Sequence, residues 1–123
     1  MGGSVPVDAA ASPIQRLKRR AEFLRAAKSG KRAARPGLVL QALPSGGAGL
    51  RVGFTVTKKV GNAVQRNRAK RRLREAARLT LPGLAISGHD LVLIGRDGTA
   101  KRPFAQLVDD LKGALRQTGV IPR

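Results

Sequence analysis

The sequence predicts a mixed α/β domain, because one chain of 123 residues carries both strand-like and helix-like periodicity. Apolar and polar residues alternate from Leu50 to Thr57, as in a strand with one buried face. Segments 16–28, 63–80 and 103–118 instead repeat apolar residues every three or four positions, as amphipathic helices do. The length allows one domain with a single modest hydrophobic core.

The first expected element is a helix over residues 16–28, which Gly30 ends. Its apolar side is formed by Leu17, Ala21, Phe23, Leu24 and Ala27. Residues 1–13 show no periodicity and are expected to be a disordered extension, although the Ser-Pro pair at their end suits the start of a short helix. The basic segment 31–37 ends in a Pro-Gly turn signal, so it is expected to be a loop.

Three segments of the chain are expected to be strands. Leu38–Leu43 is a short apolar run of strand length. In the alternating segment after it, the apolar residues share one face. The other face carries small and polar residues: Arg51, Gly53, Thr55 and Thr57. His89–Gly95 contains a block of consecutive apolar residues, which predicts a central strand buried on both faces.

The helix expected over residues 63–80 carries the functional signal. Asn62 is a good N-cap, and Gln65 three residues later completes a variant capping box. The narrow apolar stripe consists of Ala69, Leu73, Ala76, Ala77 and Thr80. Seven of the thirteen residues from Arg66 to Arg78 are basic, and only Glu75 opposes them. Since arginine binds phosphate through two parallel hydrogen bonds, this concentration favours nucleic-acid binding over a merely solvated charged face.

A helical wheel divides the polar residues of this helix into two groups. One face, with Arg66 at its border, carries Asn67, Lys70, Arg71, Arg74 and Arg78. Arg68 and Arg72 lie on the far side. The residue type leaves two roles open for Asn67: contact with a base edge, a 2′-hydroxyl or hydrated metal ions, or an ordinary polar surface position.

The last helix, 103–118, has the most regular pattern. Its apolar stripe consists of Phe104, Leu107, Val108, Leu111 and Leu115. Pro103 suits a first helical turn, and Gly119 ends the helix. We expect this stripe to pack in the core.

The charge of the chain indicates what it binds. Lysine and arginine number 25 against 7 Asp and Glu, which gives a formal net charge of +18. Because such an excess repels itself, we expect a large anionic partner: nucleic acid, an anionic membrane surface or an acidic protein. No apolar run approaches the ~18 residues of a membrane span, and the N-terminus lacks a secretory signal. We therefore expect a soluble, cytoplasmic protein with no membrane partner.

The residue types also exclude several kinds of catalytic site. The chain contains no cysteine, which excludes disulfides, cysteine-based zinc sites and thiol nucleophiles. His89 is the only histidine, and at the start of a strand it is expected to be a cap or a surface residue. The carboxylates are scattered among the expected elements, whereas a two-metal nuclease needs clustered acids. We therefore expect no catalytic residue in the polypeptide.

The segment from Gly61 to Glu75, GNAVQRNRAKRRLRE, resembles the signature helix of the protein component of bacterial ribonuclease P. That family shows an Arg-Asn-Arg core followed by basic residues at matching spacings. The preceding segment RVGFTVTKK, from Arg51, resembles the strand that leads into the signature helix. The segments 16–24 and 89–94 resemble the family's first helix and last strand, so the resemblance covers about residues 16–118.

The resemblance implies an α/β two-layer sandwich in the order αβββαβα, with a left-handed crossover where general rules favour a right-handed one. It also implies one RNA-binding domain over residues 14–119, followed by a tail of residues 120–123. In the family, the protein binds a catalytic RNA and holds the 5′ leader of precursor tRNA in a cleft between the sheet and the first helix. The RNA and its Mg²⁺ ions hydrolyse the phosphodiester, so the chain is expected to be an accessory subunit of this endoribonuclease.

Residues that match the family's motifs are expected to share their roles. The expected RNA contacts are Lys58, Lys59, Arg66, Asn67, Arg68, Lys70, Arg71, Arg74 and Arg78. The leader cleft is expected to be lined by Phe23, Ala27, Gln41, Thr55 and Thr57. The resemblance specifies no metal ligand beyond the neighbourhood of Asn67. The family commonly has aromatic residues at the positions of Ala27 and Gln41. Because stacking contributes ~1–3 kcal/mol per base, we expect this cleft to rely more on charge and hydrogen bonds.

Two other functions fit the same charge. A ribosomal-type structural RNA-binding protein would carry similar cations without a substrate cleft. A DNA-compacting protein would bind duplex DNA as tightly as structured RNA. Both alternatives predict strong salt dependence, so charge alone does not separate them from the ribonuclease P function.

Overall fold

The computed structural model describes residues 14–45, 49–84 and 86–122, so the expected N-terminal extension lies outside the described residues. The strands are β1 (Ile14–Arg16), β2 (Lys31–Arg35), β3 (Leu38–Pro44), β4 (Leu50–Val56) and β5 (His89–Gly95). The helices are α2 (Arg20–Ser29), α3 (Ala63–Thr80) and α4 (Phe104–Gln117). Short 3-10 turns occur at Lys58–Val60 and Pro82–Leu84.

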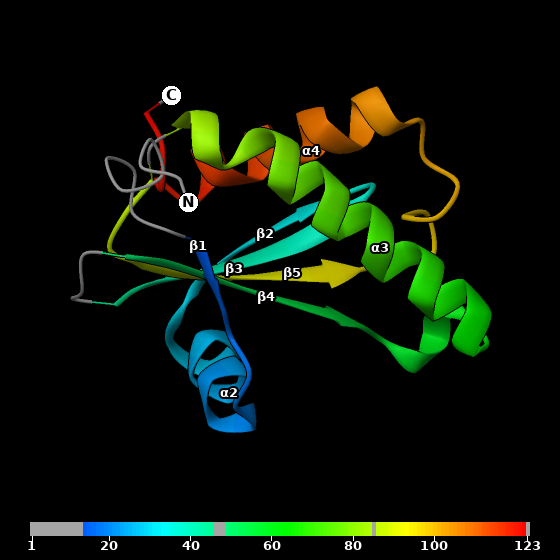
Figure 1. Ribbon diagram of the computed structural model, residues 1–123, viewed down its shortest axis with the longest axis horizontal. Coiled ribbons are helices and arrows are strands. Elements are labelled where there is room, and N and C mark those ends of the chain that lie inside the picture. The colour runs from blue at the N-terminus through cyan, green and yellow to red at the C-terminus, as the bar shows by residue number, and fades with distance from the viewer. Residues whose placement is uncertain (1–13, 46–48, 85, 123) are drawn as a thin grey trace, which may run out of the picture.

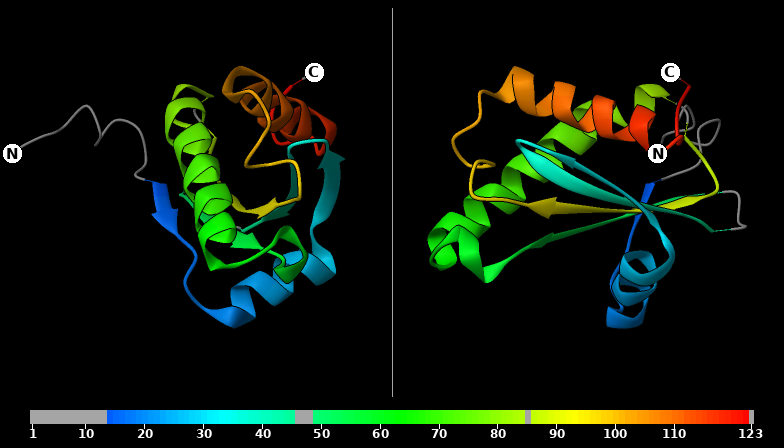
Figure 2. Two further views of the ribbon diagram at one scale, coloured as in Figure 1. Left: turned by 90° about the vertical axis from the view of Figure 1, so that its right-hand side faces the viewer. Right: turned by 180° about the vertical axis from the view of Figure 1, so that it is seen from behind.

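The strands form one sheet in the order β1-β4-β5-β3-β2. β5 lies in the middle, as its apolar block predicts, and it pairs antiparallel with β3 and parallel with β4. α3 and α4 cover one face of the sheet, and α2 packs on the other (Figure 1). Figure 2 shows from two further sides that α2 covers only part of its face. The predicted α/β class is confirmed, whereas the hand of the β4–α3–β5 connection stays a prediction.

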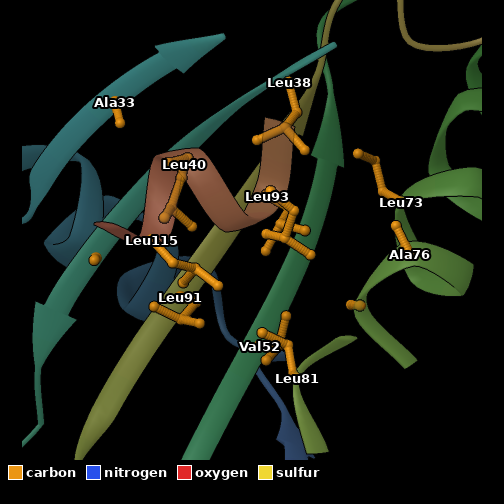
Figure 3. Packing of buried hydrophobic residues seen from close by; sticks show 14 of the residues in the cluster. Ala33, Leu38, Leu40, Val52, Leu73, Ala76, Leu81, Leu91, Leu93 and Leu115 are labelled. Atoms are coloured by element: carbon orange, nitrogen blue, oxygen red, sulfur yellow. The ribbon is translucent and has the colours of Figure 1, made fainter. Parts of the chain in front are cut away.

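The main hydrophobic core lies between the sheet and the helix pair α3 and α4. Leu91 and Leu93 of β5 enter it beside Leu40 of β3, and Leu73 and Leu115 approach from the two helices (Figure 3). All five side chains have an exposed fraction of 0%. Because burial of a leucine side chain contributes about 2 kcal/mol, this layer is the main source of stability.

A second, smaller cluster joins α2 to the opposite face of the sheet. Leu17 and Ala26 are buried against Val92 of β5, with Phe23 beside them. Leu17 precedes the helix, and Leu24 is 55% exposed. The expected apolar side of the first helix is therefore only partly correct, because α2 touches the sheet along a narrow line through Phe23 and Ala26.

Two expectations for the N-terminal part are wrong. The first helix begins at Arg20 and not at residue 16, because Ile14–Arg16 is a strand that pairs in parallel with β4. Residues 31–35 form strand β2, antiparallel to β3, rather than a loop. β2 is the edge of the sheet, where strands commonly carry charged side chains, so its basic composition gave no strand signal.

Gly30 ends α2 as predicted, but for a different reason. Its φ of −79° is one that any residue adopts. A Cβ at this position would lie 2.5 Å from the carbonyl oxygen of Ala26 and 3.0 Å from that of Ala42. The close approach of the helix end to β3, rather than a left-handed backbone, therefore requires glycine.

α3 matches the prediction at both ends and in its buried stripe. The buried residues are Ala69, Leu73, Ala76, Ala77 and Thr80. Asn62 Oδ1 accepts a hydrogen bond from the Gln65 amide at 3.0 Å, and Gln65 Oε1 accepts one from the Asn62 amide at 3.2 Å. Gly61 precedes this capping box with a φ of +140°, and a Cβ there would collide with Gln65 Oε1. The chain can enter α3 in this way only with glycine at position 61.

α4 is tied to the turn between β2 and β3 by polar contacts. Asp110, which is 7% exposed, accepts hydrogen bonds from the Gly37 amide at 2.9 Å and from Arg102 Nε at 2.6 Å. Arg35 Nη2 donates to the carbonyl oxygen of Gly113 at 3.0 Å. These bonds fix the end of the hairpin against the helix.

The C-terminal residues also belong to the core. Gly119 ends α4 with a φ of +82°, and the Val120 amide then donates to the Leu115 carbonyl oxygen at 3.0 Å. Ile121, which the sequence assigned to a tail, is 9% exposed and packs in the main core. The turn after α4 therefore returns the chain to the core.

Candidate nucleic-acid interface

The outer side of α3 presents cations without acidic partners. Because the buried stripe faces the sheet, the other side chains project away from the core. Arg68, Arg71 and Arg74 are exposed, and Arg66 and Lys70 are half-buried. Within residues 14–45, 49–84 and 86–122, none of these five forms an ion pair. An anion can therefore bind them without breaking an existing pair.

Three other predicted RNA contacts lie close to this face. Asn67 is exposed and precedes Lys70 and Arg71 by one helical turn, so the three side chains share a face. Lys58 and Lys59 are exposed on the 3-10 turn that joins β4 to α3. The polar residues expected to contact RNA are thus grouped on α3 and directly before it.

Arg78, the last of the predicted contacts, already has a partner. Its guanidinium pairs with Glu75 one turn earlier, and both side chains are exposed. This hydrogen bond holds the pKa of the Glu75 carboxyl below its ordinary value. Because exposed ion pairs contribute little, a phosphate can replace Glu75 at small cost.

Arg72, on the far side of α3, contacts protein and is not a free cation. Its Nη1 donates to the carbonyl oxygen of Ala100 at 2.6 Å, and its Nη2 donates to that of Arg102. The guanidinium carbon lies 6.0 Å from the centroid of the Phe104 ring. Arg72 therefore fixes the loop before α4, a role that its sequence position did not indicate.

Two adjoining depressions on the α2 side of the sheet form what we call the trough. The first has a volume of about 450 Å³ and includes Phe23, Ala27, Gln41 and Thr55. The second, of about 530 Å³, includes Gln41 and Thr57. The structure thus brings all five residues of the expected leader cleft to one surface, with Gln41 at the junction.

Cations line both depressions of the trough. Lys18 and Arg20 line the first depression, and Arg32, Lys59 and Arg96 line the second. The sequence did not predict a place for Arg32 in this site, because segment 31–37 was expected to be a loop. In the sheet, Arg32 pairs with Gln41, so both side chains point to the same face.

Phe23 forms a wall of the trough because Gly53 admits its ring. A Cβ on Gly53 would lie 2.6 Å from two carbons of the Phe23 ring. Gly53 is buried, and it pairs with Val92 of the central strand. The small residue that the sequence placed on this strand face therefore sets how closely α2 approaches the sheet.

A network around Arg51 holds the N-terminus of α2 in place. Arg51 donates to both oxygens of Asp90, at 2.8 and 2.7 Å, and also pairs with Glu22. Asp90 is 2% exposed, and its hydrogen bonds raise the pKa of Arg51. The Arg19 amide donates to Glu22 at 3.1 Å, which is the main reason that the pKa of Glu22 is lowered. Carboxylates that are scattered in the sequence thus converge on one guanidinium.

The acidic residues near the site, Glu22 and Asp90, bind Arg51 of the protein itself. No group of three or more His, Cys, Asp or Glu suited to a metal ion occurs in the described part of the chain. His89 Nδ1 lies 2.9 Å from the Ser87 carbonyl oxygen, in agreement with a cap at the strand start.

Among the residues placed in the structure, no helix is long and apolar enough to cross a membrane.

The chain is similar to proteins of one family along most of its length. The family model described as Ribonuclease P matches residues 12–119. The ribonuclease P protein component of Gluconacetobacter diazotrophicus is 58% identical over 111 residues, covering 89% of this chain and 96% of that protein. The corresponding protein of Paramagnetospirillum magneticum is 50% identical over 118 residues, covering 92% of this chain and 89% of that protein.

Solved structures agree with the sequence relatives. The Staphylococcus aureus ribonuclease P protein has a TM-score of 0.73 and 30% identity, covering 86% of this chain and 96% of that chain. The Thermotoga maritima ribonuclease P protein has a TM-score of 0.69 and 30% identity, covering 80% and 93%. This chain therefore belongs to the bacterial ribonuclease P protein family, whose members are the protein subunit of the ribonucleoprotein endoribonuclease that processes tRNA 5′ ends.

Proposed function

We propose that α3 binds the catalytic RNA of ribonuclease P. The proposed contacts are Lys58, Lys59, Arg66, Asn67, Arg68, Lys70, Arg71, Arg74 and Arg78. The observation that carries this proposal is a row of cations that form no ion pair with any described residue, on a helix whose stripe is fixed in the core: Arg66, Arg68, Lys70, Arg71 and Arg74. Each arginine can donate two parallel hydrogen bonds to a phosphate. We place the RNA-binding unit within residues 14–119, and we propose that residues 120–123, of which Ile121 packs in its core, make no RNA contact.

The trough is proposed to hold the 5′ leader of precursor tRNA. The cations that line it suit the phosphates of a single strand, and Gln41, Thr55 and Thr57 offer hydrogen bonds to bases or sugars. The ring of Phe23 provides one stacking surface. Because Ala27 and Gln41 stand where the family commonly has aromatic residues, stacking contributes less here and hydrogen bonds contribute more.

The hydrolysis itself is proposed to belong to the RNA and its Mg²⁺ ions, in the cytoplasm. Glu22 and Asp90 are engaged with Arg51, and Asp110 with Arg102, so these carboxylates stabilise the protein. Asn67 is the proposed neighbour of RNA-bound ions. The polypeptide contributes cationic surface and shape.

Reconstitution tests the proposal directly. Addition of the protein to the cognate catalytic RNA at low magnesium should strongly raise the rate of precursor-tRNA cleavage. Absence of stimulation at every protein ratio would refute it. Competition with duplex DNA should leave the RNA complex intact, whereas equal affinity for DNA would favour the DNA-compacting alternative.

Crosslinking separates this function from a ribosomal-type structural RNA-binding protein. A photoreactive residue at Phe23 or Thr57 should crosslink to the leader of precursor tRNA, because both positions line the trough. The same residue at the exposed position Gln106 of α4 serves as the control and should not. A structural RNA-binding protein predicts no leader contact at any of the three.

A further inference from the structure

We propose that a groove between β1 and α3 binds an unpaired base of the catalytic RNA, an inference that rests on the proposed function of α3. The groove has a volume of about 270 Å³. Its apolar lining comes from Ile14 of β1, Val52 and Phe54 of β4, Ala77 of α3 and Leu81 directly after that helix. In the left view of Figure 2, β1 lies beside α3. The groove shares only Phe54 with the lining of the trough, which lies on the α2 side of the sheet.

Three arginines surround this apolar lining. Arg74 and Arg78 line it from α3, and Arg16 lines it from β1. Arg16 and Arg74 are exposed and form no ion pair within the described ranges. An apolar slot bordered by guanidinium groups matches a nucleotide, whose base is planar and whose phosphates are anionic.

The groove is continuous with the proposed RNA face, and this argues for RNA as the occupant. Arg74 and Arg78 belong to both surfaces, so an RNA strand bound along α3 passes the opening of the groove. The volume suits a single base and not a helix of a partner protein. Ile14 is 39% exposed, so an apolar edge meets solvent beside the strongest concentration of charge in the chain. A base inserted there covers this edge while its neighbouring phosphates neutralise the arginines.

The test compares variants that remove either the apolar or the ionic part. Ile14→Thr keeps a β-branched strand residue and the same charge. It should weaken binding of the cognate catalytic RNA about fivefold, with an unchanged slope of log K against log salt, because the slope counts phosphates. Arg74→Ala should instead lower the affinity and flatten the slope by about one.

Leu79→Thr is the matched control. Leu79 is 58% exposed on the same helix but does not line the groove. Its replacement should leave RNA affinity within about twofold of the wild type. Equal losses from Ile14→Thr and Leu79→Thr would overturn the proposal, because the effect would then belong to helix or strand stability.

A second measurement uses the wild-type protein and so does not depend on a variant that folds. The chain has four isoleucines, at 14, 86, 94 and 121, whose methyl groups can be followed by NMR. Adenosine monophosphate should shift the Ile14 methyl signal, whereas ribose 5-phosphate, which lacks the base, should not. A shift confined to Ile94, which lines the trough, would contradict the proposal.

The outcomes separate this inference from the proposed function. If the wild-type protein neither binds nor activates the catalytic RNA, the proposed function fails. If it does both but Ile14→Thr binds equally well, only the groove proposal fails. An Ile14→Thr protein with normal RNA affinity and a lowered melting temperature would show that the chain itself covers the groove, which also overturns the proposal.

Discussion

Arg51 illustrates how single charged side chains hold the site together. It joins β4, β5 and the first turn of α2 through Asp90 and Glu22. Asp90 is nearly inaccessible to solvent, so it depends on this guanidinium for compensation. The position of α2, and with it one wall of the trough, follows from these contacts.

Replacement of Arg51 by methionine should lower the free energy of unfolding by about 2 kcal/mol. The reason is that Asp90 remains buried without a partner, although the partial exposure of Arg51 lets water reduce the loss. Urea unfolding measures the effect. Arg25→Met on α2, an exposed arginine outside the ion pairs of the described chain, is the control and should change little.

Glu22 predicts part of the acid sensitivity of the fold. Its pKa lies below the ordinary value of 4.5 in the native state, chiefly because the Arg19 amide donates to the carboxylate. The stability it contributes is present above that value and is lost as the pH falls through the lowered native pKa. Glu22→Gln should therefore lose less stability than the wild type between pH 7 and about pH 3 in urea titrations. Parallel pH curves for the two proteins would contradict this.

Gly53 should be intolerant of even one methyl group. Gly53→Ala pushes the Phe23 ring away from β4, which we expect to cost about 1–2 kcal/mol of stability. Binding of precursor tRNA should weaken more than binding of mature tRNA, since the ring lines the trough. Gly83→Ala is the control, because nothing lies within 4 Å of a Cβ placed there. Equal losses for both tRNAs would argue against the trough as the leader site.

At the scale of elements, α3 is a helix with two functions. Its stripe packs in the core, and its outer cations other than Arg78 form no ion pair with any described residue, but Arg72 on the far side binds the loop before α4. The helical wheel assigns these residues to different faces but does not show which part of the protein or which ligand each face contacts. Only the placement of α4 beside α3 makes Arg72 a structural residue.

Arg72→Ala and Arg68→Ala should therefore change different properties, the first the stability of the fold and the second the salt dependence of RNA binding. Arg72→Ala removes two hydrogen bonds and a cation–π contact, so it should lower stability by about 1–2 kcal/mol and leave the salt slope of RNA binding unchanged. Arg68→Ala should leave stability unchanged and flatten that slope by about one. Thermal unfolding and binding at several salt concentrations measure both. An unchanged slope for Arg68→Ala would remove this side chain from the interface.

At the scale of the whole molecule, the formal charge of +18 acts on folding and binding in opposite directions. Self-repulsion among the cations destabilises the free protein, and phosphates of a bound RNA relieve it. The apolar core between the sheet and the helix pair supplies the stability that this repulsion reduces. The fold therefore tolerates its charge but is expected to be most stable with its partner.

Added salt should raise the melting temperature of the free protein and weaken the RNA complex. Salt screens the repulsion between cations in the free chain. It also reduces the free energy that is gained when RNA binding releases counterions. If the α3 face neutralises ~5 phosphates, log K should fall against log salt with a slope near −4. Thermal melts and filter binding over the same potassium chloride series test both signs. A melting temperature that falls with salt would contradict the repulsion argument.

The sequence alone determined the elements whose signals are local. The limits, cap and buried stripe of α3 follow from residues within one helix, and the central place of β5 follows from its apolar block. The resemblance also named five of the residues that line the trough: Phe23, Ala27, Gln41, Thr55 and Thr57. Strand β2 had no apolar pattern because only Ala33 of its five residues is buried, and the strand at Ile14–Arg16 escaped prediction because three residues show no period.

Tertiary structure decided which distant residues meet. The sheet order β1-β4-β5-β3-β2 sets Arg32 opposite Gln41, brings Glu22 and Asp90 to Arg51, and places Ile14 beside α3. Which residues share a face of a helix depends only on their spacing along the chain, so sequence periodicity reveals these faces. The trough and the groove exist only where separate strands and helices pack together, and no local pattern encodes that packing.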